Sequence, residues 1–161
     1  MISAFCDWLA ATPISQTFQD LKWFVPLVQT VHILSIAVVL TAVAMTGSKL
    51  LGASIGAQPL AAMVSYFMPW VWIALATLLV TGILLTITEP SRELLNLAFR
   101  VKMVMVLGLV GLLRTIQSRL RRDPEYWTQS LRRQVAARAI GALSLLLGVS
   151  IVVAGRWIAY I

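Results

Sequence analysis

The sequence is poor in charge, in cysteine and in histidine. Of its 161 residues 12% are charged, only six are acidic, one is cysteine and one is histidine, whereas 60% are hydrophobic. An average soluble domain is about 25% charged and about 45–50% apolar, so this composition excludes an ordinary soluble enzyme. The single cysteine excludes a disulfide scaffold, and the apolar content excludes a disordered tail. The composition is that of a small polytopic membrane protein.

Four apolar runs predict an all-α fold, a bundle of four transmembrane helices in one domain covering residues 1–161. A helix needs about 20 apolar residues to cross a bilayer. The runs lie at about residues 25–46, 67–88, 97–116 and 139–158. Short interfacial amphipathic helices are expected beside them, the clearest at residues 13–24, where Thr12 suits an N-cap and Pro13 the first helical position.

Three connecting segments also have the pattern of short or starting helices. Residues 59–67 place apolar side chains on one side, which is typical of a helix lying on the membrane surface. Residues 89–91 (Glu-Pro-Ser) end the second run and restart a short helix with Ser91 as its cap. Residues 123–125 (Asp-Pro-Glu) predict a helix start that leads into the fourth run.

The third run is interrupted by charge. Only uncharged residues lie between Lys102 and Arg114, and this stretch extends about 17 Å as a helix. The hydrocarbon core of a bilayer is about 30 Å thick. Lys102, Arg114 or both therefore lie within the membrane boundary, where each either snorkels toward the headgroups or faces the bundle interior and binds something.

Basic residues predict the orientation in the membrane. Lys49 lies in the first connector, and the connector before the fourth run carries, with its flanks, a set of arginines: Arg114, Arg119, Arg121, Arg122, Arg132, Arg133 and Arg138. The positive-inside rule places these residues in the cytoplasm and both termini outside, in a bacterial inner membrane. The net charge of +7 follows from this retention. The expected partner is the lipid bilayer, not nucleic acid, because anionic headgroups lie nearest to the basic loop.

Glycines in the fourth run predict close helix packing. Gly141, Gly148 and Gly155 recur every seven residues, and small residues let helix backbones approach closely in lipid. The stripe serves either packing inside the bundle or the interface of a homodimer. The sequence leaves both alternatives open.

The candidate site centres on His32. It lies eight residues into the first run, about 10–12 Å below the outer boundary by helical rise, and a titratable ring at that depth is a candidate functional group. Gln29 precedes it by one turn, Lys102 opens the third run on the same side, and Arg156 lies at the end of the fourth. These four residues are expected to converge in the outer third of the bundle.

Three functions are compatible with this set. In the first, His32 only hydrogen-bonds across helices, and the protein is non-enzymatic, either free-standing or an accessory subunit of a membrane complex. In the second, it binds haem b with His32 as the axial metal ligand and Lys102 and Arg156 paired with the propionates. The third is a copper or small-solute permease. The apolar runs contain no Asp or Glu, which excludes paired-carboxylate catalysis, so no catalytic residue is predicted.

The segment from Trp8 to Lys102 resembles a family of small bacterial four-helix membrane proteins with no assigned function. The resemblance rests on short motifs: Trp23-Phe24-Val25-Pro26, Thr30-Val31-His32, Lys49-Leu50-Leu51-Gly52, Trp70 with Trp72, Thr81-Gly82, and Asn96-Leu97-Ala98-Phe99-Arg100-Val101-Lys102. That family tends to have an acid where Gln29 stands and Asp-x-Arg where Gly47-Ser48-Lys49 stands. These departures weaken the case for a charge relay.

A more distant resemblance concerns only the layout of one His in the first run and one Lys opening the third. This layout is similar to the copper-resistance D-type membrane proteins and to the small haem-binding membrane protoporphyrinogen oxidases. In the protoporphyrinogen oxidases, a His and a Lys at these two places are important for function. The resemblance therefore implies haem binding through His32 and Lys102.

Overall fold

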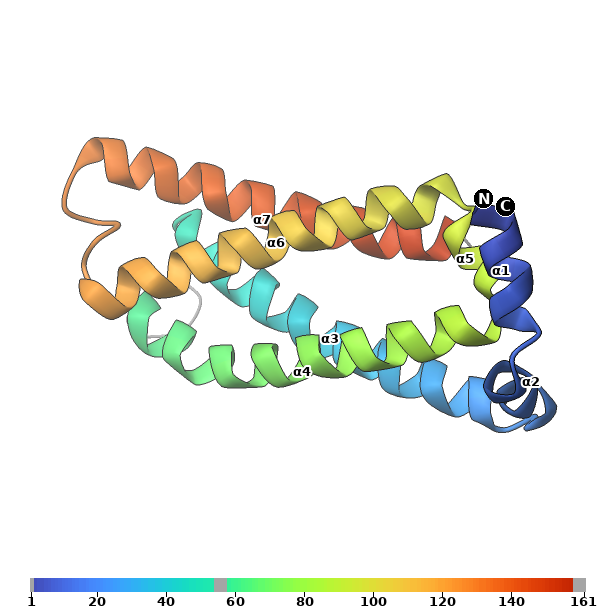
Figure 1. Cartoon of the computed structure of the whole chain (residues 1–161). Helices are drawn as coiled ribbons and strands as arrows, with labels where there is room; N and C mark the ends of the chain where they lie inside the picture. Colours follow the sequence, from blue (N-terminus) through green and yellow to red (C-terminus); the bar gives the residue numbers. More distant parts are fainter. Residues whose placement is uncertain (1, 54–57, 158–161) are drawn as a thin grey trace.

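The computed structural model describes residues 2–53 and 58–157, which form helices joined by short connections (Figure 1). The helices are α1 (Ile2–Ala10), α2 (Pro13–Asp20), α3 (Phe24–Leu50), α4 (Leu60–Thr88), α5 (Pro90–Leu94), α6 (Leu97–Arg122) and α7 (Leu131–Trp157). No strand occurs in these two stretches. The predicted all-α class is confirmed.

Three of the helices, α3, α4 and α7, are long and apolar enough to cross a membrane. Helix α6 is of similar length, with 26 residues, but it carries several basic side chains: Arg100, Lys102, Arg114, Arg119, Arg121 and Arg122. Among the described residues there are thus three candidate spans where four were predicted. The chain is a helical membrane protein, and the fourth span is not confirmed.

The long helices form two antiparallel pairs. Helix α3 lies beside α4 and α6 beside α7, and α7 also crosses α3, which joins the two pairs (Figure 1). The short helices α1, α2 and α5 gather at one end of the bundle, here called the short-helix end. Residues 123–130, between α6 and α7, lie at the opposite end, here called the loop end.

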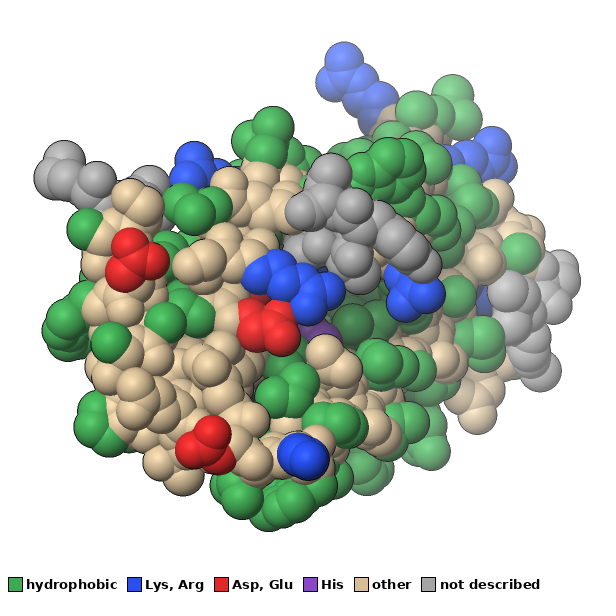
Figure 2. Space-filling view, turned by 90° about the vertical axis from the view of Figure 1, so that its right-hand side faces the viewer, with side chains coloured by type: hydrophobic (Ala, Val, Ile, Leu, Met, Phe, Trp, Pro, Cys, Tyr) green, Lys and Arg blue, Asp and Glu red, His purple; other side chains and the backbone are tan. Residues whose placement is uncertain are grey.

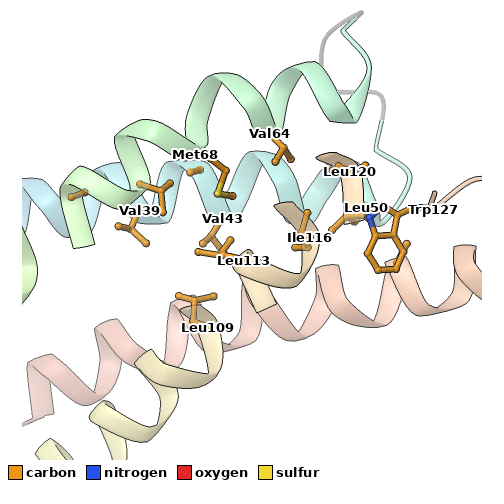
Figure 3. Close-up of a cluster of buried hydrophobic side chains, with 14 of the residues drawn as sticks. Val39, Val43, Leu50, Val64, Met68, Leu109, Leu113, Ile116, Leu120 and Trp127 are labelled. Carbon is orange, nitrogen blue, oxygen red and sulfur yellow. The ribbon is translucent and has the colours of Figure 1, made fainter. Parts of the chain in front are cut away.

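Each long helix buries one narrow stripe of side chains. On α7 the buried positions are spaced by three or four residues, and the other long helices show similar spacings. Such spacing is typical of helices that pack at small crossing angles. Figure 3 shows the resulting core, which is formed by Val39, Val43, Leu50, Val64, Met68, Leu109, Leu113, Ile116, Leu120 and Trp127. The opposite faces expose large apolar side chains such as Leu79 and Leu107, which fits contact with lipid.

Glycine brings α7 against α3. A Cβ atom built on Gly141 would lie only 2.8 Å from the carbonyl oxygen of Gly47 and 2.9 Å from Leu50 Cβ. Gly148 also faces α3 side chains, and Gly155 faces Lys102 of α6. The glycine stripe was predicted to serve either packing inside the bundle or a homodimer interface. In the structure it packs inside the bundle. A homodimer through Gly141, Gly148 and Gly155 would need a face that the chain's own helices occupy.

Polar side chains of the N-terminal segment cap the end of α4. Pro90 has no N–H and stops the helix, so the last carbonyl groups of α4 lack helical partners. The Ser15 hydroxyl donates to Ile87 O at 2.7 Å, and Gln19 Nε2 donates to Thr88 O at 3.0 Å. The buried Cys6 thiol lies 3.6 Å from Pro90 O. These contacts fix α1 and α2 over the short-helix end.

Two of the predicted surface helices have different bounds. The helix predicted at residues 13–24 ends at Asp20 as α2, because a turn precedes the start of α3 at Phe24. Residues 59–67 are not a separate surface helix, since α4 continues from Leu60 through Pro69 to Thr88. The last residue of the predicted run 139–158 lies outside the described residues.

Two of the predicted helix starts are also wrong. Residues 123–125 form a turn instead, in which Asp123 Oδ1 accepts from the Glu125 N–H at 3.1 Å, and α7 begins only at Leu131. An Asp side chain bonded to the backbone two residues on is as suited to a turn as to a helix cap. Helix α5 begins at Pro90, with Glu89 rather than Ser91 at the N-cap position.

Candidate functional site

His32 is half-buried on α3 and is held by α4. Its Nδ1 lies 2.8 Å from Thr81 Oγ1, and the Thr81 hydroxyl donates to the carbonyl of Thr77 at 2.7 Å. A hydroxyl has one proton to donate, so the Thr81 oxygen accepts from the His32 Nδ1–H. In the neutral ring this arrangement leaves the lone pair on Nε2.

Gly82 gives the imidazole its place against α4. A Cβ atom at Gly82 would lie 3.7 Å from His32 Cε1, which is an ordinary contact distance. The ring therefore packs beside the backbone of α4 at the same turn to which it is hydrogen-bonded. Thr81 and Gly82 together determine where the ring lies and which of its nitrogen atoms is left for a ligand.

Lys102 is the second member of the site. Its half-buried side chain passes Gly155 of α7, where an added Cβ would lie 3.7 Å from Lys102 Nζ. The Lys102 charge interacts electrostatically with His32 and with Glu93. Four helices thus contribute to one polar layer, defined here as His32 of α3, Thr81 of α4, Glu93 of α5 and Lys102 of α6.

Glu93 is the acidic member of this layer, and the sequence analysis missed it. It is half-buried on α5, and burial raises the pKa of its carboxyl above the usual range, while the positive charge of Lys102 opposes that rise. The sequence feature that indicates Glu93 is Pro90. It starts a new short helix, α5, directly after α4, and this helix places Glu93 over the end of the bundle.

The polar layer is open at the short-helix end. Figure 2 looks onto this end and shows a histidine side chain in a hollow, beside basic and acidic side chains. The chain has one histidine, so this side chain is His32. Part of the imidazole is therefore visible from the short-helix end of the bundle.

Two of the predicted site residues are not part of this layer. Gln29 is exposed, although it precedes His32 by one turn of α3. Arg156 is also exposed, and it follows Gly155 at the end of α7. The structure brings together His32 and Lys102 of the predicted set.

The bundle is apolar beneath the polar layer. A cavity of about 40 Å³ lies one turn deeper, lined by apolar side chains that include Ile36, Leu78, Val106 and Ile151. A buried water molecule needs two or more polar partners. The apolar lining of this cavity supplies no polar side chain, so it provides no polar path from His32 toward the loop end.

Metal chemistry at this site is restricted by the ligands available. Within residues 2–53 and 58–157 no group of three or more His, Cys, Asp or Glu side chains is placed to hold a metal ion.

Comparison with known proteins gives one match. A model described as a family of unknown function (DUF6644) matches residues 10–161. That region begins at the end of α1 and includes every residue of the polar layer. No curated protein and no solved structure matches the chain.

Proposed function

The chain belongs to the DUF6644 family of unknown function, and we propose from its site that it is a non-enzymatic inner-membrane protein that binds a small acidic solute. In this proposal α3, α4, α6 and α7 all span the membrane. Both termini and the short-helix end face outward, and the arginine-rich loop end faces the cytoplasm. The three apolar helices support membrane insertion, and the distribution of arginines supports the orientation.

The length and contacts of α6 support its inclusion as the fourth span. Its 26 residues extend about 39 Å, more than the hydrocarbon core. The charge nearest its middle, Arg114, is exposed and lies over the Trp72 ring at 5.6 Å from the centroid. A cation on an aromatic ring, with its stem along an apolar surface, is compatible with a place near the membrane boundary.

The hydrogen bond between His32 and Thr81 carries the functional part of the proposal. It directs the Nδ1–H inward and leaves the Nε2 lone pair as an acceptor, in a layer that also holds the Lys102 ammonium. An acceptor and a cation together suit a solute with an acidic proton and a carboxylate-like group. The apolar lining of the cavity below favours binding at this layer over passage through the bundle, so a permease is not proposed.

The proposal is tested on the imidazole of the detergent-solubilised full chain. Because the chain has one histidine, ¹⁵N-histidine labelling reports on His32 alone, and bicarbonate serves as the probe anion because it carries both an acidic O–H and a carboxylate-like group. We expect a saturable shift of the Nε2 resonance, which Lys102→Met abolishes. Lys22→Met is the matched control, because Lys22 is an exposed lysine before α3. A shift that does not saturate, or that survives Lys102→Met, contradicts the proposal.

Haem b is the second candidate, favoured by the donor chemistry of His32. A metal-bound histidine usually donates its other ring N–H to a neighbouring acceptor, and Thr81 is such an acceptor. Lys102 would pair with a propionate, and the group would supply redox chemistry when bound. The donors fit haem, but the cavity of about 40 Å³ one turn below His32 is far too small for a porphyrin. A porphyrin in that place would require the helices to separate.

An absorption spectrum distinguishes the two candidates. We expect protein purified in mild detergent to be colourless, with no Soret band after haem is added. A Soret band that His32→Ala removes, together with a haem-dependent rise in Tm, would replace the solute proposal with the haem one. Uptake of copper ions by liposomes that depends on His32 would instead support a permease, and co-purification of other membrane proteins would support an accessory subunit.

A further inference from the structure

We propose that the loop end carries a binding site for the phosphate headgroup of an anionic phospholipid, formed by Arg119, Tyr126 and Arg133. The site lies at the opposite end of the bundle from the His32 layer. It uses the membrane orientation of the proposed function but none of the solute-binding residues. The occupant is inferred from the geometry, the charge and the apolar surface of this end.

One aromatic ring holds two arginines in place. The Arg133 guanidinium carbon lies 4.3 Å from the centroid of the Tyr126 ring, and that of Arg119 lies 5.1 Å from it. Arg119 comes from the end of α6, Arg133 from the start of α7, and Tyr126 from the turn between them. Cation–π attraction offsets part of the repulsion between the two cations, so one ring holds both guanidinium groups at the loop end.

The ring itself is fixed by the core. Trp127 is only 6% exposed and belongs to the buried apolar cluster shown in Figure 3. The Tyr126 ring packs edge-on against it, with the centroids 4.9 Å apart. The two arginines are therefore positioned by a buried side chain and not by a solvated loop alone.

The nearby acids do not neutralise these arginines. Within residues 114–138, all of which the structure describes, no ion pair joins Arg119 or Arg133 to Asp123 or Glu125. The Asp123 carboxylate instead accepts from Gln129 Nε2 at 2.5 Å and from the Glu125 N–H. Arg133 Nη1 donates to Gln129 Oε1, but each guanidinium has five N–H donors in all, so further donors remain for a ligand. The pair is suited to an anion with several oxygen atoms, such as a phosphate group.

The surface beside the pair points to a lipid as the source of that phosphate. The first turns of α7 expose the apolar side chains Leu131 and Val135, which are 77% and 59% exposed and lie one helical turn apart. Arg133 lies two residues from each of them and therefore points to another side of α7, but their exposure indicates that lipid surrounds the first turns of this helix, at the level of the arginine pair. Basic sites of this kind at the cytoplasmic ends of helices attract the anionic lipids of that leaflet.

Native mass spectrometry of the full chain in detergent tests the site. Phosphatidylglycerol and phosphatidylcholine with the same acyl chains are compared, and we expect wild type to prefer phosphatidylglycerol. Arg119→Gln with Arg133→Gln should lower this preference by about fivefold for each arginine removed. Arg121→Gln with Arg132→Gln removes the same charge from exposed positions outside the proposed site, and it should leave most of the preference.

A second pair of variants tests the ring. Tyr126→Phe should keep the lipid preference and Tyr126→Leu should lower it, because only the former keeps an aromatic face. An equal loss in both double-arginine variants would overturn the proposal, since it would indicate diffuse electrostatic attraction. Displacement of phosphatidylglycerol by an equal concentration of inorganic phosphate would overturn the lipid assignment. The His32 ¹⁵N signals report on folding and on the other end, so failure of this site is distinguishable from failure of the solute site.

Discussion

At Gly141, α7 lies directly against the backbone of α3, whereas at Gly155, two heptads further along the same stripe, it makes room for the side chain of Lys102. A Cβ atom at Gly141 would lie 2.8 Å from a carbonyl oxygen, and one at Gly155 would lie 3.7 Å from an ammonium nitrogen. The same residue type at the same spacing thus serves tight backbone packing toward the loop end and a polar site at the short-helix end. A glycine repeat in a membrane helix is therefore compatible with both roles.

The largest effect is expected where the backbones touch. Gly141→Val should lower the free energy of unfolding by about 3 kcal/mol, because neither Gly47 O nor the α3 backbone can move away from the new side chain. Chemical unfolding in detergent, followed by circular dichroism, measures this loss. Gly111→Ala is the control, since nothing lies within 4 Å of its added Cβ, and it should stabilise α6 by up to about 1 kcal/mol. Equal effects of the two changes would contradict the tight contact.

The next effect concerns the attachment of the short helices. Ser15→Ala removes the donor to Ile87 O from a fully buried position. An unsatisfied buried carbonyl costs about 1–3 kcal/mol, and the loss should be confined to α1 and α2. Hydrogen exchange of residues 2–20 should rise while that of α7 stays unchanged. The exposed Thr17→Ala is the matched control, because its hydroxyl bonds only within α2. Faster exchange throughout the bundle would contradict a local attachment.

A smaller effect is expected at the hydrogen bond that orients His32. Thr81→Val keeps the shape of the side chain but removes the oxygen that accepts from Nδ1. We expect a loss of about 1 kcal/mol in stability and a mixed population of the two ring tautomers, which ¹⁵N chemical shifts measure directly. Thr86→Val, also on α4 and bonded only to Gly82 O, should leave the ring unchanged. An unaltered tautomer in Thr81→Val would show that another group orients the imidazole.

The smallest expected effect is a pH dependence of stability, which arises from Glu93 at the short-helix end. Burial raises the pKa of Glu93, against the opposing charges of Lys102 and Arg92 and with a like charge on Glu89. The folded protein therefore binds this proton more tightly than the unfolded chain does. Its contribution to stability is complete at low pH and is lost as the pH rises through the pKa of the folded state.

Thermal unfolding across the acidic range checks this sign. Tm of wild type should fall more steeply with rising pH than Tm of Glu93→Gln. Glu89→Gln is the control, since Glu89 is exposed and paired with Arg92 at 2.6 Å. A wild-type curve parallel to that of Glu93→Gln would show that Glu93 does not contribute.

The two ends also differ in how far sequence reasoning reaches. The runs at 25–46, 67–88 and 139–158 predict α3, α4 and α7 because hydropathy is a local property of the chain. Their ends are less accurate, since a helix continues past the apolar residues wherever its backbone has partners, as α4 does from Leu60. The prediction of a helix start at Asp123 is wrong because the same side chain suits both a turn and a helix cap.

The site depends on contacts between distant segments, which a single sequence does not contain. His32 and Lys102 stand out because titratable groups are rare in apolar runs. Thr81 does not stand out, because threonine is common in such helices and its role depends on which faces of α3 and α4 meet. Glu93 was missed because its burial depends on how α5 folds over the bundle. Gln29 was included by spacing alone, although its side chain is exposed.

The capping of α4 by the N-terminal segment has a consequence for biogenesis. Ser15 and Gln19 bond to carbonyl groups that lie 72 and 69 residues later in the chain. The ribosome releases α2 before the end of α4 has been synthesised. Helix α2 therefore cannot form these hydrogen bonds until α4 has emerged. Helix α2 is thus synthesised before α4 but reaches its final position after α4, and it closes the structure only after both α3 and α4 are inserted.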